Sequence, residues 1–209
     1  MEHITNQIIL RGCLSSLPQF SHENHGKQFY RFVLEVPRLS GAVDLLPVIA
    51  QDTVLGSLDP CGGQMLTVTG QIRSHNIRQD GVRHLLIFVF AQTIVAEDGD
   101  AINDVTLCGP ICKEPNYRRT PLGREICDVM LALPRAYSRA DYLPCILWGR
   151  TAQEAASHHT RDMICIQGRL QSRIYTKLTQ DGLQEHTAYE ISALTAQFPQ
   201  PCAAAHPDP

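Results

Sequence analysis

Short runs of alternating apolar and polar residues fill most of the chain and are separated by glycine, proline and Asp-Gly turns. Alternation with a period of two is typical of strands that pack one face on a core. The clearest runs are MLTVTGQIRSH (65–75) and MICIQGRLQSR (163–173), each with a central glycine at which a strand can bend. A helical pattern is confined to TAQEAASHH (151–159) and a weaker counterpart after Asp52. The pattern predicts a mostly β protein.

The two halves of the chain repeat the same series of turn-forming residues. A shift of about 97 residues places several residues of the first half on identical residues of the second. The aligned pairs are Asn6–Asn103, Gly12–Gly109, Pro18–Pro115, Gly26–Gly123, Pro37–Pro134, Arg38–Arg135, Asp44–Asp141 and Pro47–Pro144. Slightly larger shifts align Gly70 with Gly168 and the two Asp-Gly turns at 80–81 and 181–182. These matches indicate a duplication with its boundary in the acidic connector AEDGDA (96–101).

Each copy reads as five strands with a short helix between the third strand and the fourth, which is the order of the OB-fold barrel. We therefore predict an all-β protein of two tandem OB-fold five-stranded barrels. The N-terminal barrel would cover residues 1–98 and the C-terminal barrel residues 99–198, followed by a short flexible tail over 199–209. The length of 209 residues suits two domains of roughly 100 residues each.

The charge is small but unevenly distributed, with a net value of -3 over the chain. Residues 1–101 carry seven Lys/Arg against ten Asp/Glu, and residues 102–209 carry eleven against eleven. The second half is therefore richer in cations. No apolar run reaches the roughly 18 residues that a membrane span needs, and the start of the chain lacks the basic segment and cleavage site of a secretory signal. We expect a cytoplasmic protein without membrane contact.

The eight cysteines are scattered, with no CxxC pair and no companion pair that would complete a zinc site. We therefore interpret them as reduced thiols that pack as small hydrophobic residues. The chain also lacks a GxxxxGK[ST] phosphate loop and an HExxH motif. No metal, cofactor or catalytic residue is predicted, and the protein is not expected to be an enzyme.

The second copy resembles the bacterial single-stranded DNA-binding protein family over nearly its whole length. The matching segments are NDVTLCGPI (103–111), DYLPCILWGRTA (141–152), IQGRLQSRIYT (166–176) and TAYEISAL (187–194). The first copy fits the same outline more loosely, so the chain is similar to tandem forms of this family. The resemblance implies a sequence-tolerant binder of single-stranded DNA (ssDNA) without catalysis. The ending QFPQPCAAAHPDP lacks the acidic tail with which many members recruit partners.

Such a binder needs cations for the phosphates and flat rings for the bases. In GRLQSRIY, the alternation puts Arg169, Gln171, Arg173 and Tyr175 on one side and Leu170 and Ile174 on the other. By the same periodicity, Tyr142 and Trp148 share a face, and Arg150 follows at once. The family resemblance implies stacking by Tyr142, Trp148, Tyr175 and Tyr137, and basic contacts from Arg118, Arg150 and Arg173. The predicted ssDNA-binding residues are Trp148, Tyr175, Tyr142, Tyr137, Arg173, Arg150, Arg169 and Arg118.

At the matched positions of the first copy, Leu45, Gln51 and Ile77 stand where the second has Tyr142, Trp148 and Tyr175. The first barrel is thus predicted to keep the fold with a degenerate binding face. Two alternatives remain. It pairs with another subunit through Leu45 and Ile77, which we favour, or it binds ssDNA weakly through Arg31, Arg38 and Arg73.

The predicted function is sequence-independent ssDNA binding in replication, recombination or repair, with a positive groove along the phosphates. One alternative is a primosome-type accessory OB protein that bridges replication proteins. The other is an RNA-binding OB module, because stacking grooves do not exclude RNA. The predicted partners are ssDNA, a second copy in a homodimer with four OB-folds, and replication or repair proteins.

Overall fold

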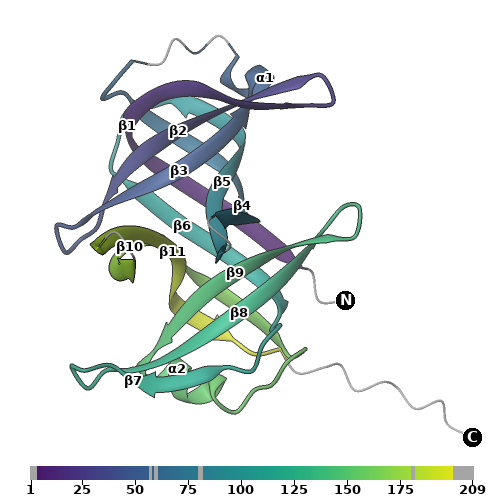
Figure 1. The fold of residues 1–209 in the computed structure, drawn as a ribbon, viewed down its shortest axis with the longest axis vertical. Helices are drawn as coiled ribbons and strands as arrows, with labels where there is room; N and C mark the ends of the chain where they lie inside the picture. The colour runs from purple at the N-terminus through teal and green to yellow at the C-terminus, as the bar shows by residue number, and fades with distance from the viewer. Residues whose placement is uncertain (1–3, 57, 59–60, 80–81, 180–181, 200–209) are drawn as a thin grey trace, which may run out of the picture.

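The N-terminal half of the computed structural model is a closed β-barrel with one short helix (Figure 1). The structure describes residues 4–56, 58, 61–79, 82–179 and 182–199. The elements of this half are β1 (Thr5–Asn24), β2 (Lys27–Pro37), β3 (Val43–Gln51), α1 (Asp52–Leu55), β4 (Met65–Gln79) and β5 (Val82–Ala96). The strands follow the order β1-β2-β3-β5-β4-β1, so the first strand closes the barrel on both sides. This arrangement is the predicted OB-fold.

The C-terminal half repeats this arrangement with its first strand interrupted. Its elements are β6 (Ile102–Pro110), β7 (Asn116–Arg119), β8 (Glu125–Arg135), β9 (Arg139–Trp148), α2 (Gly149–Ala155), β10 (Met163–Thr179) and β11 (Gly182–Gln197). Together β6 and β7 occupy the place of the long β1. An isolated bridge between Ile111 and Leu131 connects β8 to the chain just after β6. The tandem OB-fold prediction is confirmed, with six strands rather than five in the second barrel.

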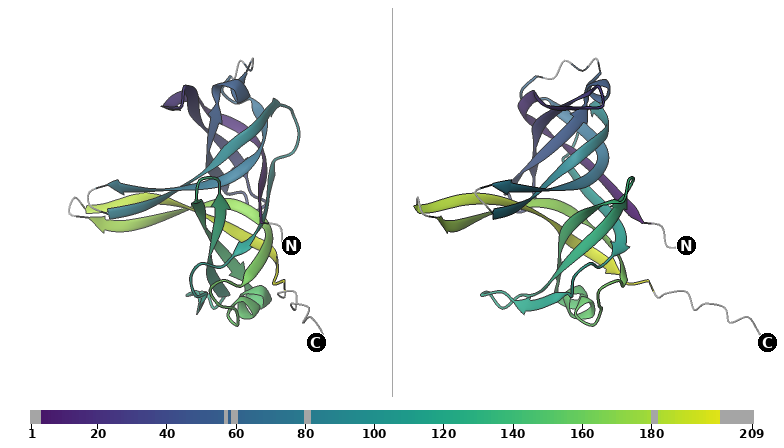
Figure 2. Two further views of the ribbon diagram at one scale, coloured as in Figure 1. Left: turned by 90° about the vertical axis from the view of Figure 1, so that its right-hand side faces the viewer. Right: turned by 45° about the vertical axis from the view of Figure 1, so that its right-hand side comes forward.

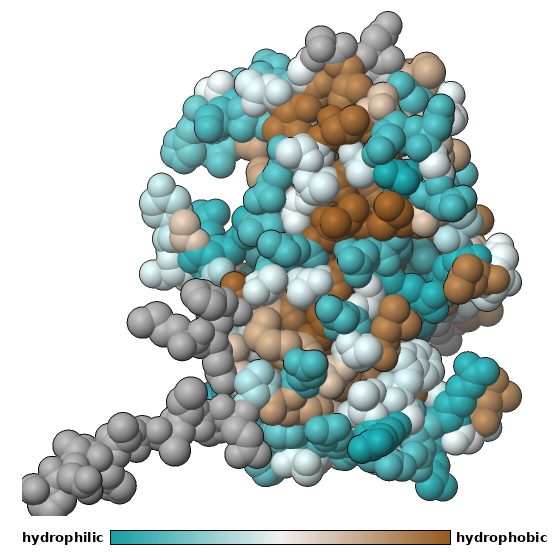
Figure 3. Space-filling model, turned by 180° about the vertical axis from the view of Figure 1, so that it is seen from behind, coloured by the Kyte–Doolittle hydropathy of each residue, from teal (hydrophilic) through white to brown (hydrophobic). Residues whose placement is uncertain are grey.

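The two barrels are joined edge to edge through their first strands. Strands β1 and β6 pair antiparallel from Thr5 opposite Cys108 to Arg11 opposite Ile102. All eleven strands consequently belong to one continuous hydrogen-bonded sheet. Figure 3 shows the molecule from behind, where hydrophobic surface areas alternate with hydrophilic ones along both halves.

The side chains that alternate to the inner face of each strand form the core of each barrel. Along β9, Asp141, Leu143, Cys145 and Leu147 are buried, and the intervening even-numbered residues lie on the outer face. The central glycines of β4 and β10 have a packing cause. A Cβ atom on Gly168 would lie 2.3 Å from the carbonyl oxygen of Ser192, and the pairing register shifts at this residue. Only glycine permits this close approach of two strands at the bend.

Both barrels extend a long hairpin to the same side of the molecule. The β4–β5 and β10–β11 hairpins project side by side (Figure 2). The rings of His84 on β5 and His186 on β11 lie 6.4 Å apart in a stacked arrangement. We call these two projections the arms. The tips of the predicted Asp-Gly turns lie outside the described residues, but the strands that flank them pair as the prediction requires.

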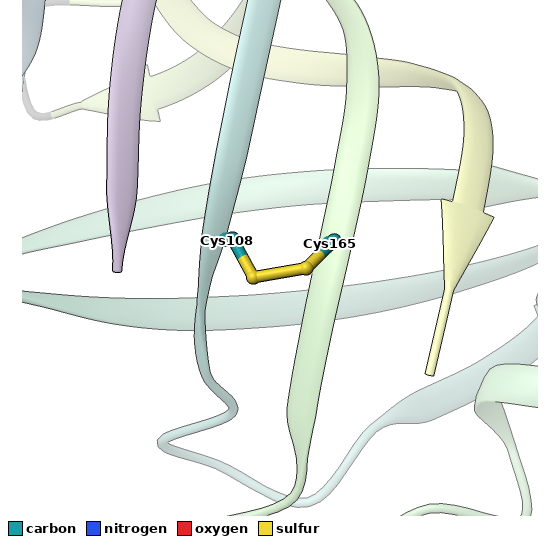
Figure 4. The surroundings of a disulfide bond; sticks show 2 residues. All are labelled: Cys108 and Cys165. Carbon is teal, nitrogen blue, oxygen red and sulfur yellow. A yellow bond between two sulfur atoms is a disulfide. The ribbon is translucent and has the colours of Figure 1, made fainter. Parts of the chain in front are cut away.

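One pair of cysteines departs from the prediction of reduced thiols. Cys108 on β6 and Cys165 on β10 form a disulfide (Figure 4). The two residues face each other directly across the antiparallel strands, with Cα atoms 4.0 Å apart. Their separation of 57 residues in sequence conceals this pairing. Cys127 and Cys145 are free and buried as expected, and burial raises the pKa of the Cys127 thiol to about 11. Cys202 lies outside the described residues.

The second helix is shorter and begins earlier than the pattern predicts. It covers Gly149–Ala155 rather than 151–159. Beyond the helix, the Asp162 carboxylate accepts a hydrogen bond from the backbone N–H of His159 and contacts His158 Nδ1. These contacts stabilise a non-helical turn where the pattern predicted a continued helix. Most of the predicted tail at 199–209 lies outside the described residues. Among the residues that are described, no helix has the length and hydropathy to cross a membrane.

Candidate nucleic-acid interface

A groove on the outer face of the C-terminal barrel brings three predicted residues together. Trp148, Arg118 and Arg173 all line it, and its volume is about 600 Å³. They come from three different strands, β9, β7 and β10. The floor is apolar and consists of Ile126, Val129, Met130, Pro144, Cys145 and Ile146. A flat ring beside an apolar floor and two guanidinium groups is the chemistry that stacks a base and holds a phosphate.

The Trp148 ring is held in place by one hydrogen bond. Its indole Nε1–H donates to Ser192 Oγ on β11 at 3.1 Å. The side chain is half-buried, and its backbone pairs with Ile126 on β8. A fixed ring loses little conformational freedom when a base stacks on it. The outer-face location agrees with the predicted stacking role, which stays a prediction.

The cations of the groove are accompanied by an equal number of acids. Its basic residues are Lys113, Arg118 and Arg173, and its acidic residues are Glu114, Asp128 and Glu190. Arg118 makes a two-point contact with Asp128, at 2.7 and 3.2 Å, and these hydrogen bonds raise the pKa of Arg118. Arg173 Nε lies 3.6 Å from a Glu190 oxygen. The lining is therefore neutral by formal charge, in contrast to the positive groove that we predicted.

Tyr175 lies beyond the groove, on the arm. Its ring stacks on His186 with centroids 5.5 Å apart, and the Arg173 guanidinium lies 5.6 Å from the Tyr175 centroid. Because His186 also faces His84, the arm of the first barrel supports this series of rings.

The burial expected along β10 is wrong at two residues: Gln171, assigned to the outer face, is 8% exposed and donates a hydrogen bond to Glu190, and Ile174, assigned to the inner face, is exposed. Ile174 is 67% exposed, because the arm extends past the barrel and has no core on either side.

The four remaining predicted residues are dispersed around the groove. Tyr142 is 41% exposed on the same face of β9 as Trp148, next to the seam between the barrels. Arg150 is exposed in the first turn of α2, and Arg169 is half-buried on β10. Tyr137 is 94% exposed in the β8–β9 turn with a backbone φ of 61°. None of these four lines the 600 Å³ groove.

The matched face of the N-terminal barrel carries rings that the position-by-position comparison missed. Gln51 pairs with Phe29 across β2 and β3, as Trp148 pairs with Ile126. The aromatic residue has thus moved to the neighbouring strand. Phe29 contacts Phe90 at 6.0 Å and is stacked by His22 at 4.8 Å. Comparing Gln51 with the residue opposite it on β2 would have found Phe29 in the sequence, whereas Phe90 comes from β5 on the other side of β3.

The seam between the barrels is held by two related contacts of buried aspartates. Asp44 on β3 accepts hydrogen bonds from the backbone N–H and the hydroxyl of Ser172 on β10, at 2.7 and 3.0 Å. Asp141 on β9 accepts one from the backbone N–H of Ser74 on β4, at 2.7 Å. Each aspartate therefore joins its own barrel to the arm of the other. We call these contacts the Asp44 latch and the Asp141 latch.

Arginines neutralise both aspartates. Arg38 contacts the Asp44 carboxylate through Nε and Nη2 at 2.7 and 2.5 Å. Burial alone would raise the pKa of Asp44, but the hydrogen bonds from Arg38 and Ser172 outweigh it and hold the pKa below its ordinary value. Arg73 contacts Asp141 at 3.0 Å. Two arginines proposed above as weak DNA contacts are consequently occupied within the protein.

Comparison with known proteins gives the class first. Residues 102–199 match the model of the single-strand binding protein family. The crystal structure of the wild-type single-stranded DNA binding protein from Thermus aquaticus superposes with a TM-score of 0.79 at 21% sequence identity. That alignment covers 98% of this chain and 97% of the other, so both chains share the tandem OB-fold architecture.

Sequence relatives carry the assignment further. Single-stranded DNA-binding protein B of Bacillus subtilis is 31% identical over 106 residues, which are 47% of this chain and 91% of that protein. The single-stranded DNA-binding protein of Bacillus cereus is 32% identical over 107 residues, and the match spans 61% of its length. This chain belongs to the single-strand binding protein family, whose members are DNA-binding proteins and not enzymes.

Proposed function

We propose that the protein binds ssDNA independently of sequence, and that the C-terminal groove is its principal contact surface. The observation that carries this proposal is the Trp148 ring, fixed by Ser192 beside an apolar floor and two arginines. Each base stacked on an aromatic ring contributes about 1–3 kcal/mol. The strand would run from Trp148 along Arg173 towards Tyr175, with Tyr142, Arg118, Arg150 and Arg169 as flanking contacts.

Fluorescence tests this proposal directly, because Trp148 is the single tryptophan of the chain. Titration with oligo-dT is expected to quench its emission as a base stacks on the indole. An unchanged emission at a DNA concentration that saturates binding by anisotropy would remove Trp148 from the contact surface. Competition between poly-dT and poly-U, measured in the same assay, decides between DNA and RNA as the preferred strand.

The protein would act in replication, recombination or repair as a homodimer with four OB barrels. Leu45 on β3, one of the two residues through which we expect the first barrel to pair, is 47% exposed, and Ile9 on β1 and Val95 on β5 are further exposed apolar residues of the same barrel, which supports a second copy as a partner. Sedimentation at micromolar concentration tests the assembly, and a monomer there contradicts it. If the main role is to bridge replication proteins, a pull-down of such a partner is expected to persist with Tyr175→Ala.

A further inference from the structure

A small polar crevice lies at the seam between the barrels, separate from the C-terminal groove. Its volume is about 240 Å³. Residues from β4, the end of β8 and the start of the chain line it: Ile4, Asn6, Gln71, Arg73, Leu133, Pro134, Arg135 and Ala136. Both charged residues among these are arginines, and the described lining includes no acid. The crevice therefore differs from the C-terminal groove, where acids and cations balance.

The two arginines share one buried carboxylate. Arg73 Nη1 and Arg135 Nε lie 3.0 and 3.4 Å from the same Oδ2 of Asp141. Asp141 is fully buried, and both arginine side chains are partly exposed. Two positive charges against one negative charge leave one positive charge uncompensated. A buried carboxylate also keeps both guanidinium groups close together despite their repulsion.

Arg135 is held less tightly than its counterpart in the first barrel. Its Nε atom is buried beside Asp141 without a hydrogen bond in the described part of the chain, so a ligand would contact the rest of the guanidinium, in a side chain that is 27% exposed. Its matched residue Arg38 donates three hydrogen bonds, two to Asp44 and one to the carbonyl of Ser172 at 2.7 Å. The cause of the difference is Arg73, which already occupies Asp141. At the position that matches Arg73, the side of the seam with the Asp44 latch has Gln171, whose side-chain amide donates to Glu190.

The rim of the crevice adds a ring and a further cation. Tyr137 directly follows the lining residue Ala136 and is the most exposed of the predicted stacking residues. Arg139 is exposed and pairs with Arg135 across the β8–β9 hairpin. A guanidinium presents several donors in a planar fork that matches phosphate oxygens. The combination of two arginines that share one carboxylate and an adjacent ring is suited to one nucleotide of a single strand.

We propose that this crevice binds one phosphate group of the ssDNA backbone through Arg135 and Arg73, and that Tyr137 stacks on the neighbouring base. The proposal rests on the ssDNA binding proposed above. At about 240 Å³ the crevice falls below the range of about 300–1,000 Å³ that is typical of sites for whole small molecules. A single phosphate, free or within a strand, is therefore the group that fits.

The salt dependence of oligo-dT binding tests the crevice, with Arg135→Gln as the variant. This change removes the charge together with the fork. We expect affinity to fall about tenfold and the slope of log K against log salt to lose about 0.7, the contribution of one phosphate on a single strand. Arg38→Gln is the matched control, because Arg38 is fully engaged by Asp44 and Ser172; its slope should equal that of the wild type. Equal slopes for all three proteins would overturn the proposal.

A second variant guards against misfolding of Arg135→Gln. Ala136→Asp places a carboxylate at the exposed rim and should weaken oligo-dT binding about threefold to tenfold by repulsion. Leu39→Asp, the matched and fully exposed position on the other seam, should leave it unchanged. Identical affinities for the wild type and both rim variants would count against the crevice.

Inorganic phosphate separates the two possible sources of the ligand. Thermal unfolding is followed as phosphate rises at constant ionic strength. If the wild type gains stability and Arg135→Gln does not, the crevice binds phosphate as such, even if oligo-dT fails to bind at all. Failure of oligo-dT binding would contradict the proposed function, whereas an unaltered slope with normal binding would contradict only the backbone-phosphate contact.

Discussion

The outer faces of the two barrels carry different aromatic and charged residues on the same fold. The C-terminal face combines a single fixed ring, Trp148, with arginines that acids already neutralise. The N-terminal barrel has a buried Phe29 on β2 that contacts Phe90 on β5, with His22 stacked on Phe29. It also has an exposed arginine, Arg31, where the C-terminal face has Asp128. The comparison teaches that a duplicated barrel can change its outer surface while its strand order and the seam aspartates Asp44 and Asp141 are retained.

The largest expected effect tests the shared part of this comparison. Asp44→Asn and Asp141→Asn each leave a buried arginine contact without its anion, which typically costs about 3–5 kcal/mol of unfolding free energy. Urea unfolding followed by circular dichroism measures the loss. We expect Asp141→Asn to cost more, because it leaves both Arg73 and Arg135 without their anion and their repulsion unopposed, whereas Asp44→Asn releases only Arg38. A loss in only one variant would show that the two latches are not equivalent.

The Asp44 latch also predicts a pH dependence. Because its folded pKa is below the ordinary 3.8, its contribution is fully present above that value and is lost as pH falls through the lower folded value. Unfolding free energy is therefore expected to drop in acid below about pH 4, and less steeply in Asp44→Asn. Parallel acid limbs for the two proteins would assign the drop to other carboxylates.

Exchange of the residue that distinguishes the two faces should give the next largest effect. Trp148→Gln gives the C-terminal barrel the residue that the N-terminal barrel has at the matched position, Gln51. Loss of one stacked base, about 1–3 kcal/mol, corresponds to a roughly 5- to 150-fold weaker affinity for oligo-dT. Fluorescence anisotropy of labelled oligo-dT measures it. The matched control Gln51→Ala should change affinity less than twofold, and a larger effect there would place the strand on the N-terminal face.

The arms allow a third contrast between the halves. Tyr175→Ala removes a ring that already packs on His186, and we expect oligo-dT affinity to fall about fivefold to tenfold, at the lower end of the stacking range. Ile77→Ala at the matched position should have little effect on binding by the same assay. Equal losses from both variants would indicate that the arms act through packing between them rather than through stacking on bases.

The smallest expected effect is a gain. Asp128→Asn releases Arg118 from its two-point contact, so phosphate no longer competes with a carboxylate. We expect oligo-dT affinity to rise about twofold to fivefold, in keeping with the modest energies of exposed ion pairs. Glu125→Gln provides the control, since Glu125 pairs with Arg119 outside the groove. A decrease with Asp128→Asn would mean that this aspartate positions Arg118 for the strand.

Much of the fold could be predicted because its signals are local. Alternation located the strands around Gly70 and Gly168, and the repeated turn residues located the duplication. The same periodicity failed at Ile174, because it reports a buried face only where a core exists on one side. The site was partly predictable for the same reason. Periodicity along β9 and β10 places Trp148 and Arg173 on the outside of the barrel. The acids that neutralise the groove, Asp128 and Glu190, come from other strands, and periodicity along one strand does not show that they are close.

The sequence alone determined the two-barrel architecture, the family resemblance and the outer location of the Trp148 face. These follow from spacing along one strand at a time, which the backbone geometry makes periodic. Only the tertiary structure decided which cysteines meet, at a separation of 57 residues, and which arginines are engaged. Arg38 reaches the carbonyl of Ser172 across 134 residues, while Arg135 at the matched place makes no such bond. Strand order and register bring such residues together, and neither is written in the periodicity of any single segment.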